Sequence, residues 1–409
     1  MKASETQSLA ASALDLAVAG RRLSREQVLA LYEVPWPELA AAAHGLRLQR
    51  TDPEIATYSI GGNIDYTNVC VVACKFCAFY RAGHQKDAFT LTFDEILRQM
   101  EEIRRIGGRD VLIQGGVNPD LPFEWYLELF RLLKAGYPEI HVDALSPEEI
   151  LGLEKLSGRD AEELLADLKD AGMDGMPGAS AEILVDEVRT STAPTRLTVR
   201  TWFRIIDAAL KLGLFNPWVS MVTGFGETPA QRVEHLLALR EYQDIAVDRY
   251  GNGFAAFKVW PARLEPTRLN GKAPTVHPDE TSREYLRHVA VARLVLNNIR
   301  NHRAVWRTMG FGVAQAALRA GANDLCGTGS INAITAAMTA SGKQFQDPTQ
   351  LLIQQVEGCI SAAGFVPALR DVHYNILSCN RVVGTALDDS AATSGVVAVC
   401  GRKNEEANA

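Results

Sequence analysis

Short apolar runs alternate with amphipathic segments from about residue 57 to residue 320, and this alternation restricts the possible folds more than any other feature. Thr92 and Glu95 form a capping box at the start of one helical pattern, and residues 111–113 follow that pattern as a buried strand. Strands that alternate with helices predict βαβ units and a parallel sheet. Further helices are expected at 123–135, 160–171, 198–212, 229–243, 280–299 and 312–320, and strands at 140–145, 218–222, 253–260 and 304–308.

Roughly six to eight such units favour an α/β fold of the (β/α) TIM-barrel type, and a doubly wound sheet is the alternative. Residues 1–50 read as an N-terminal helical segment, in which Ser24 and Gln27 form a second capping box. The barrel is expected over 51–330. Residues 331–384 are expected to be a helical and strand extension that packs on the barrel, and 385–409 a mobile tail.

Composition excludes several classes of protein. Of 409 residues, 47% are apolar and 22% charged, as in ordinary globular proteins, and the net charge of −7 provides no basic field for nucleic acid. No apolar run is long enough to span a membrane, and the N-terminus lacks a secretory signal pattern. We therefore expect a cytoplasmic protein without nucleic-acid or membrane partners.

Three of the seven cysteines lie within eight residues: Cys70, Cys74 and Cys77, spaced C-x₃-C-x₂-C. They follow the first expected strand, at the end of a barrel where active sites lie. Three thiolates on one loop can bind a [4Fe-4S] cluster and leave one iron open, or bind zinc with His84 as the fourth ligand. The odd count and the scatter of the other four cysteines argue for reduced thiols rather than a disulfide framework.

Residues 58–80, with an aromatic residue before the third cysteine, resemble the radical S-adenosylmethionine (SAM) superfamily. They are most similar to its menaquinone (futalosine-route) and deazaflavin-cofactor group, above all to cyclic dehypoxanthinyl futalosine synthases. The resemblance covers about residues 20–377. Further matching segments are Gln114–Pro122, Trp125-Tyr126, Leu145–Ile150, Pro177–Arg189, Arg232–Gln243, Arg293–Asn298, Ala317–Asp324 and Ala363–Pro367.

The resemblance implies a [4Fe-4S] cluster on the three cysteines and cleavage of SAM to a 5′-deoxyadenosyl radical. That radical would abstract hydrogen from a small-molecule substrate, and an electron donor such as flavodoxin or ferredoxin would reduce the cluster. By the same resemblance, Glu182 would bind the ribose and Arg189 the carboxylate of SAM. The full expected cofactor-binding set is Phe76, Tyr80, Gln114, Gly115, Gly116, Ser146, Glu182 and Arg189. Ser146 is equally well explained as a helix cap, and the two glycines as a simple turn.

The chain departs from the family on the substrate side. Asn118 and Asp143 stand where the family has histidines, as does Phe225 in the turn that ends at Glu227. Because most of the family's general acids and bases are missing, we expect SAM cleavage to be retained and the substrate to differ. Asp143 and Glu227 are the expected catalytic residues, and Asn118, Asp143, Phe225 and Arg307 the expected substrate contacts. Other departures lie at Ala179, Ser180, Met309, Gly312, Trp260–Arg263 and Gly327–Asn332.

Overall fold

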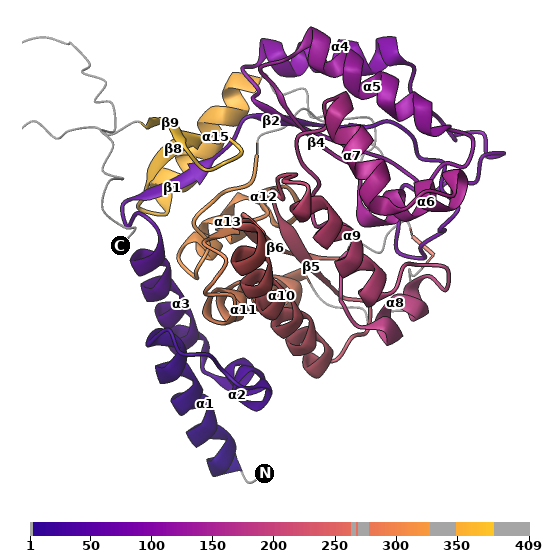
Figure 1. Ribbon diagram of the computed structural model, residues 1–409. Helices are drawn as coiled ribbons and strands as arrows, with labels where there is room; N and C mark the ends of the chain where they lie inside the picture. The colour runs from indigo at the N-terminus through magenta and orange to yellow at the C-terminus, as the bar shows by residue number, and fades with distance from the viewer. Residues whose placement is uncertain (1–2, 263–266, 269–277, 328–348, 380–409) are drawn as a thin grey trace, which may run out of the picture.

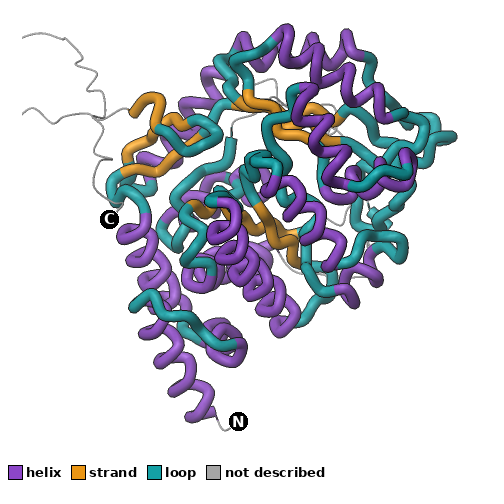
Figure 2. The backbone as a smooth tube through the Cα atoms, viewed as in Figure 1, coloured by secondary structure: helices purple, strands orange, loops and turns teal. Residues whose placement is uncertain are grey.

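The structure is a computed structural model that describes residues 3–262, 267–268, 278–327 and 349–379. Two three-stranded parallel sheets form most of a barrel (Figures 1 and 2). The first contains β2 (Gly61–Asp65), β3 (Asp110–Gln114) and β4 (His141–Ala144). The second contains β5 (Val219–Thr223), β6 (Ala256–Pro261) and β7 (Asn301–Arg303).

Isolated parallel bridges join these sheets into a ring. On one side, Gly175 bridges Asp143 of β4 and Phe215 just before β5. On the other side, Asp324 bridges Arg303 of β7 and Thr57 of β1 (Ile55–Tyr58), the strand that leads into β2. The expected parallel barrel is therefore confirmed, and the doubly wound sheet is excluded.

Helices surround the strands and supply the outer half of the core. Phe257 and Val259 of β6 pack into the main apolar core, so the alternation of the strand directs Lys258, between them, toward the barrel axis. Both capping boxes, at Ser24 and Thr92, are present. The surrounding helices are α4 (Phe93–Arg105), α5 (Phe123–Gly136), α6 (Pro147–Ser157), α7 (Ala161–Ala171), α8 (Asp186–Thr192), α9 (Val199–Lys211), α10 (Pro229–Tyr250), α11 (Pro278–Val295), α12 (Trp306–Met309) and α13 (Phe311–Leu318).

The N-terminal segment contains α1 (Ala3–Val18), α2 (Arg25–Ala30), the 3₁₀ turn η1 (Leu31–Glu33) and α3 (Trp36–Arg50). α3 packs against α11, and α1 extends away from the barrel (Figure 1). Arg287 of α11 donates to the Tyr32 and Val34 carbonyls at 2.9 and 2.8 Å. The segment thus packs on the side of the barrel.

The C-terminal part closes the end of the barrel where the strands begin. It contains α15 (Thr349–Ala362), β8 (Val366–Arg370), parallel to β1, and β9 (Ile376–Cys379), antiparallel to β8. In the turn between β8 and β9, the His373 ring lies 4.4 Å from the Phe215 ring, and Tyr374 Oη accepts from Arg303 Nε at 2.8 Å. The opposite end, where β2 to β6 finish, carries the cysteine loop.

Two expectations were wrong. The strand expected near 304–308 lies earlier in the chain, since β7 is Asn301–Arg303 and Trp306 begins a helix. Cys379 is disulfide-bonded, whereas we expected the scattered cysteines to be reduced. The segment 328–348 and the expected tail lie outside the described residues. In the described ranges no helix has the length and hydropathy needed to cross a membrane.

Candidate active site

The cysteine loop follows β2 and is fixed to its surroundings by backbone hydrogen bonds. Cys70 N–H donates to the Arg81 carbonyl at 3.0 Å, and Lys75 N–H donates to the Thr192 carbonyl at the end of α8 at 2.9 Å. Thr195 Oγ1 donates to the Val72 carbonyl at 3.0 Å. All three cysteines are half-buried on this one loop.

The two glycines after β3 allow the cysteine loop to lie directly on the strand end. A Cβ atom on Gly116 would lie 2.1 Å from the Val69 carbonyl oxygen and 2.8 Å from Cys70 Cβ. A Cβ on Gly115 would lie 2.8 Å from the Tyr66 ring. Close packing against the cysteine loop therefore requires glycine at both positions, which a simple turn would not explain.

The buried carboxyl group of Glu149 fixes the end of β3 through hydrogen bonds. Glu149 Oε1 accepts from Gly115 N–H at 3.0 Å and from Tyr66 Oη at 2.8 Å, and Oε2 accepts from Ser146 Oγ at 2.6 Å. Burial raises the pKa of Glu149 to about 7. Ser146, expected to bind the cofactor, therefore acts in this structure as the N-cap of α6 and a partner of Glu149.

Arg196, in the loop before α9, connects the cysteine loop to two carboxylates. Its guanidinium forms an ion pair with Glu182, lies 3.7 Å from Glu148 Oε2 and lies 3.7 Å from Cys74 Sγ. It also lies over the Phe76 ring, 5.2 Å from its centroid. Arg196 was not expected from the sequence, because no local pattern marks this loop and only the folded chain brings it to the cysteines.

Arg189, expected to bind the SAM carboxylate, is buried and holds backbone carbonyls. Its Nε donates to Leu197 at 2.9 Å, and Nη1 donates to Ser180 and Ala181 at 3.0 and 2.9 Å. These bonds hold the loop that carries Glu182 next to Arg196. Arg189 thus shapes the site in this structure. Its Nη2 has no hydrogen-bond partner among the described residues.

Backbone strain is concentrated around this site. Four of the five non-glycine residues with positive φ in the described ranges lie in the cysteine loop or just after strands of the barrel. They are Ala73 at 55°, Leu145 at 60°, Ser180 at 59° and Glu182 at 36°. Such conformations cost energy and persist where the surrounding structure enforces them, most often at ligand sites.

The residues present fit an iron–sulfur cluster with an anionic ligand. Arg189 Nη2 and Arg196 Nε are buried without a hydrogen-bond partner in the described part of the chain, so two donors are available beside the cysteine loop. Burial raises the pKa of Cys74 to about 12, and cluster binding would release such protons. Over the described ranges no three His, Cys, Asp or Glu side chains already surround a metal position. His84, the alternative zinc ligand, is exposed.

The turn after β5 closes over the cysteine loop. The Phe225 and Phe76 rings lie 4.8 Å apart. Glu227, expected to be catalytic, accepts from the Gly224 and Phe225 N–H groups at 3.1 and 2.8 Å and from Arg232 Nε at 2.8 Å. Its carboxylate therefore stabilises the turn.

Two other expected residues lie around the loop. Asn118 Nδ2 donates to the hydroxyls of Thr67 and Thr90 at 3.3 and 3.1 Å, so its amide anchors the start of the loop. Tyr80 lies under Arg268, whose guanidinium is 4.7 Å from the ring centroid and donates to the Cys74 carbonyl at 3.3 Å. Gln114 ends β3, next to the two glycines.

Asp143 and Arg307 lie on other elements of the barrel than the cysteine loop. Asp143 Oδ1 lies 3.0 Å from His141 Nε2, and the His141 ring packs against His373 in the turn that closes the far end. Burial raises the pKa of Asp143. Arg307 lies on α12, and burial lowers its pKa.

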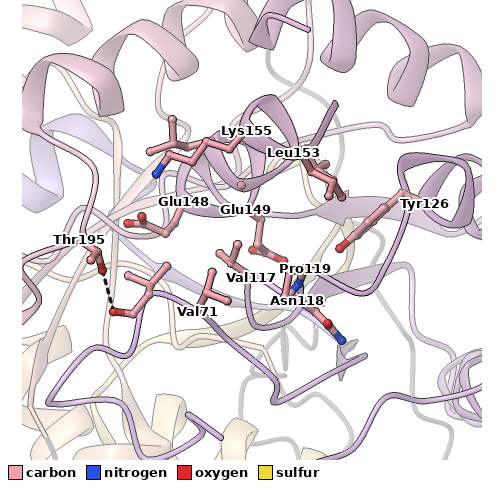
Figure 3. Close-up of a pocket in the computed structure, with 14 residues that line it drawn as sticks. Val71, Val117, Asn118, Pro119, Tyr126, Glu148, Glu149, Leu153, Lys155 and Thr195 are labelled. Atoms are coloured by element: carbon pink, nitrogen blue, oxygen red, sulfur yellow. Dashed lines mark hydrogen bonds between the residues drawn. The ribbon is translucent and has the colours of Figure 1, made fainter. Parts of the chain in front are cut away.

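A cavity of about 270 Å³ lies between the cysteine loop and α6 (Figure 3). Val71 and Val117 point toward Glu148 and Glu149 across it. None of the three cysteines lines it. It therefore lies beside the loop, and Glu148 links it to Arg196.

Two family models match the chain. The Radical SAM superfamily model matches residues 64–239, and the model of the CofH/MqnC C-terminal region matches residues 251–383. The cyclic dehypoxanthine futalosine synthase of Halalkalibacterium halodurans is 36% identical over 89% of this chain and 94% of its own length. A 5-amino-6-(D-ribitylamino)uracil–L-tyrosine 4-hydroxyphenyl transferase of Microcystis aeruginosa is 33% identical over 87% and 95%. The aminodeoxyfutalosine synthase of Streptomyces coelicolor is 32% identical over 88% and 91%.

Solved structures share the fold. Methylornithine synthase (PylB) matches with a TM-score of 0.65 and 16% identity, over 87% of this chain and 97% of that chain. The hydrogenase maturase HydG from Carboxydothermus hydrogenoformans matches with a TM-score of 0.67 and 16% identity, over 91% and 82%. With the curated relatives, these matches lead to one conclusion: the chain is a radical SAM enzyme and belongs to the family that shares the CofH/MqnC C-terminal region.

Proposed function

We propose that this enzyme holds a [4Fe-4S] cluster on Cys70, Cys74 and Cys77 and cleaves SAM. Its substrate is a nucleoside-like or other small molecule, and the reaction ends in radical cyclisation or carbon–carbon bond formation. SAM bound to the cluster would supply the 5′-deoxyadenosyl radical that abstracts hydrogen. The observation that carries the proposal is Arg196, which lies 3.7 Å from Cys74 Sγ and keeps a buried N–H without a partner in the described part of the chain.

Arg196 takes the role that the sequence suggested for Arg189. A guanidinium beside the cysteines binds the carboxylate of SAM through its free Nε–H, since a hydrogen bond between two charged groups is stronger than one between neutral groups. Glu182 holds Arg196 in place and accepts from the ribose hydroxyls. The carbonyl oxygens of Gly115 and Gly116 would accept from the amino group of SAM, since their N–H groups are already bonded to Glu149 and Thr67. Tyr80 and Phe76 provide apolar surface.

The substrate differs from that of the cyclic dehypoxanthine futalosine synthases. Asn118 and Asp143, which replace two family histidines, are already bonded to Thr67 and Thr90 and to His141. Asn118 carries no titratable group, and the Asp143 carboxyl is already paired with His141, so neither takes over the acid–base role of a family histidine unchanged. Relatives with three differently named reactions are 32–36% identical, so identity does not favour one substrate strongly. The second candidate is cyclic dehypoxanthine futalosine synthase itself, supported by the 36% identity over 94% of that relative.

Anaerobic turnover with SAM, dithionite and dehypoxanthine futalosine separates these candidates. We expect 5′-deoxyadenosine without consumption of dehypoxanthine futalosine. Full turnover of this substrate would contradict the altered substrate and support the second candidate. Flavodoxin or ferredoxin, the proposed physiological donors, are then compared with dithionite as the reductant.

A further inference from the structure

The outer face of the cysteine loop exposes an apolar side chain. Val71 directly follows Cys70 and is 57% exposed, the highest value for a large apolar residue in the described ranges. Leu156, in the last turn of α6, is 47% exposed and lines the same cavity as Val71. Single exposed apolar residues are ordinary, but an apolar pair at the rim of a hollow is typical of an interaction site. None of the roles above uses this pair.

The cavity between these two residues has a mainly aliphatic wall. The side chains come from the cysteine loop, the loop after β3 and α6, and they are Val71, Val72, Val117, Pro119, Leu151, Leu153 and Leu156. Figure 3 shows Val71, Val117 and Leu153 around the cavity. A cavity of roughly 150 Å³ accommodates benzene. The volume of about 270 Å³ can therefore admit one large apolar side chain of a partner.

Two lysines beside the cavity carry uncompensated charge. Lys155 of α6 is exposed and lines the cavity. Lys75, on the cysteine loop, donates its Nζ to a backbone carbonyl at 2.6 Å, which is a neutral acceptor. The ion-paired lysines of the described ranges are Lys134 and Lys211. Lys75 and Lys155 therefore give this face positive charge that no carboxylate of the described ranges neutralises.

Two carboxylates of α6 next to this face are already neutralised by arginine. Glu154 pairs with Arg204 at 2.6 Å, and the buried Glu148 lies 3.7 Å from Arg196 Nε. Arg200 is exposed one helical turn before Arg204, so it lies on the side of α9 that packs on α6. The whole chain is acidic, with a net charge of −7, so this local excess of positive charge is a specific feature of the face.

An apolar centre with a charged rim is the usual anatomy of a protein interface. A positive rim favours an acidic partner, because complementary charge speeds the encounter and fixes the orientation of the two proteins. The face is held in place, since Thr195 Oγ1 donates to the Val72 carbonyl at 3.0 Å and Lys75 N–H to the Thr192 carbonyl at 2.9 Å. Its centre belongs to the loop that carries the three cysteines, so a protein bound there lies next to them.

We propose that this docking face, formed by Val71, Lys75, Lys155, Leu156 and Arg200, binds an acidic electron-carrier protein of the flavodoxin class. The carrier inserts one large apolar side chain into the cavity, and its carboxylates pair with the cations. The carrier is oxidised by one electron, which the cluster on the cysteine loop accepts. This proposal rests on the proposed function, because that cluster is the acceptor.

Flavodoxin binding tests the docking face without turnover. Binding of fluorescently labelled flavodoxin to the full chain, with the cluster reconstituted anaerobically, is measured by anisotropy at low and at high salt. Lys155→Glu reverses a charge at the rim and should weaken binding about tenfold or more at low salt. The loss should be smaller at high salt, since salt screens exposed charges. Leu156→Ser removes an apolar contact and should weaken binding about tenfold at both salt concentrations.

Two matched controls lie on the N-terminal segment, away from α6 (Figure 1). Arg21→Glu reverses a charge at an exposed position, and Leu29→Ser removes an apolar side chain that is 39% exposed. Neither should change flavodoxin binding. All four substitutions lie at the surface, so the urea midpoint should shift little. With dithionite as the reductant, Lys155→Glu and Leu156→Ser should form 5′-deoxyadenosine at the wild-type rate, because a small reductant needs no docking face.

Several results would overturn the proposal. They are no flavodoxin binding by wild type at low salt, equal affinity in wild type and in both Lys155→Glu and Leu156→Ser, or equal weakening by Arg21→Glu and Lys155→Glu. A wild-type dimer in sedimentation that Leu156→Ser dissociates would also overturn it, since a second copy of the chain would then cover the face. Formation of 5′-deoxyadenosine by wild type under dithionite is assayed separately: its absence would contradict the proposed function and leave the binding result standing.

Discussion

Two buried clusters of arginine and carboxylate lie at opposite ends of the barrel. At the closed end, Asp324 is bound by Arg370 through both oxygens, at 2.5 and 3.1 Å. At the cysteine end, Arg196 pairs with Glu182, and its Nε lies 3.7 Å from Glu148 Oε2 but has no hydrogen-bond partner among the described residues. In the first cluster, which we call saturated, the carboxylate binds arginine through both oxygens. In the second cluster, buried arginine N–H groups remain without a hydrogen-bond partner among the described residues. Because an unpaired buried donor costs energy, its persistence indicates a ligand site, whereas saturation indicates a structural role.

Asp324→Asn breaks the saturated cluster at the closed end and should lower the free energy of unfolding more than any other substitution proposed here. It leaves Arg370 and Arg303 as buried charges without their carboxylate, so the free energy of unfolding should fall by about 3–5 kcal/mol. Urea unfolding measures this. A loss below about 1 kcal/mol would show that the closed end does not depend on the pair.

Glu149 separates position from bonding in this comparison. It lies at the cysteine end, but both of its oxygens already accept hydrogen bonds. Its pKa of about 7 is higher than in the unfolded chain, so its stabilising effect is complete below about pH 4.5 and is lost as the pH rises through 7. The loss should reach about 3 kcal/mol. In Glu149→Gln this part of the pH dependence should disappear when unfolding is measured at pH 5 and pH 8. An unchanged pH dependence would contradict the assignment.

Arg196→Lys tests the cluster at the cysteine end. The substitution keeps the positive charge but removes the planar guanidinium and its Nε–H. SAM affinity should therefore fall by about 10- to 100-fold, as expected for the loss of hydrogen bonds to a charged group. Equilibrium binding of SAM measures this. The free energy of unfolding should change less than in Asp324→Asn. The reverse order of effects, with SAM affinity intact and stability lost, would make this cluster structural as well.

Asp244→Asn should have the smallest effect and is the matched control for Asp324→Asn. Asp244 pairs with Arg22 at 2.6 Å on the surface, with a side chain that is 50% exposed. Solvent screens such pairs, so the free energy of unfolding should change by less than about 1 kcal/mol. A change as large as that of Asp324→Asn would mean that burial does not distinguish the pairs.

Local patterns predicted the fold well, because capping and strand alternation are determined by neighbours in sequence. The boxes at Ser24 and Thr92 and the barrel itself are examples. The wrong strand at 304–308 is a short apolar run, for which periodicity cannot separate strand from helix. The disulfide of Cys379 could not be predicted from spacing.

The site was predicted less completely, because depth along a barrel axis is a tertiary property. Strand alternation places Asp143 inward, but does not show that its carboxyl group is bound by His141. Glu227 and Ser146 are bound by groups within five residues of themselves, and a reading of turns and caps could have assigned them there. Arg196 carries no local signal, since its significance depends on its position next to Cys74.

The central claim is that the cysteine loop binds a cluster with an iron open to SAM. Its most direct test is the formation of 5′-deoxyadenosine under dithionite by the anaerobically reconstituted chain, with iron counted in the same sample. We predict about four iron atoms per chain and 5′-deoxyadenosine from wild type and Cys359→Ala, and neither from Cys74→Ala. One zinc per chain with no 5′-deoxyadenosine, or equal cleavage by Cys74→Ala, would contradict the account.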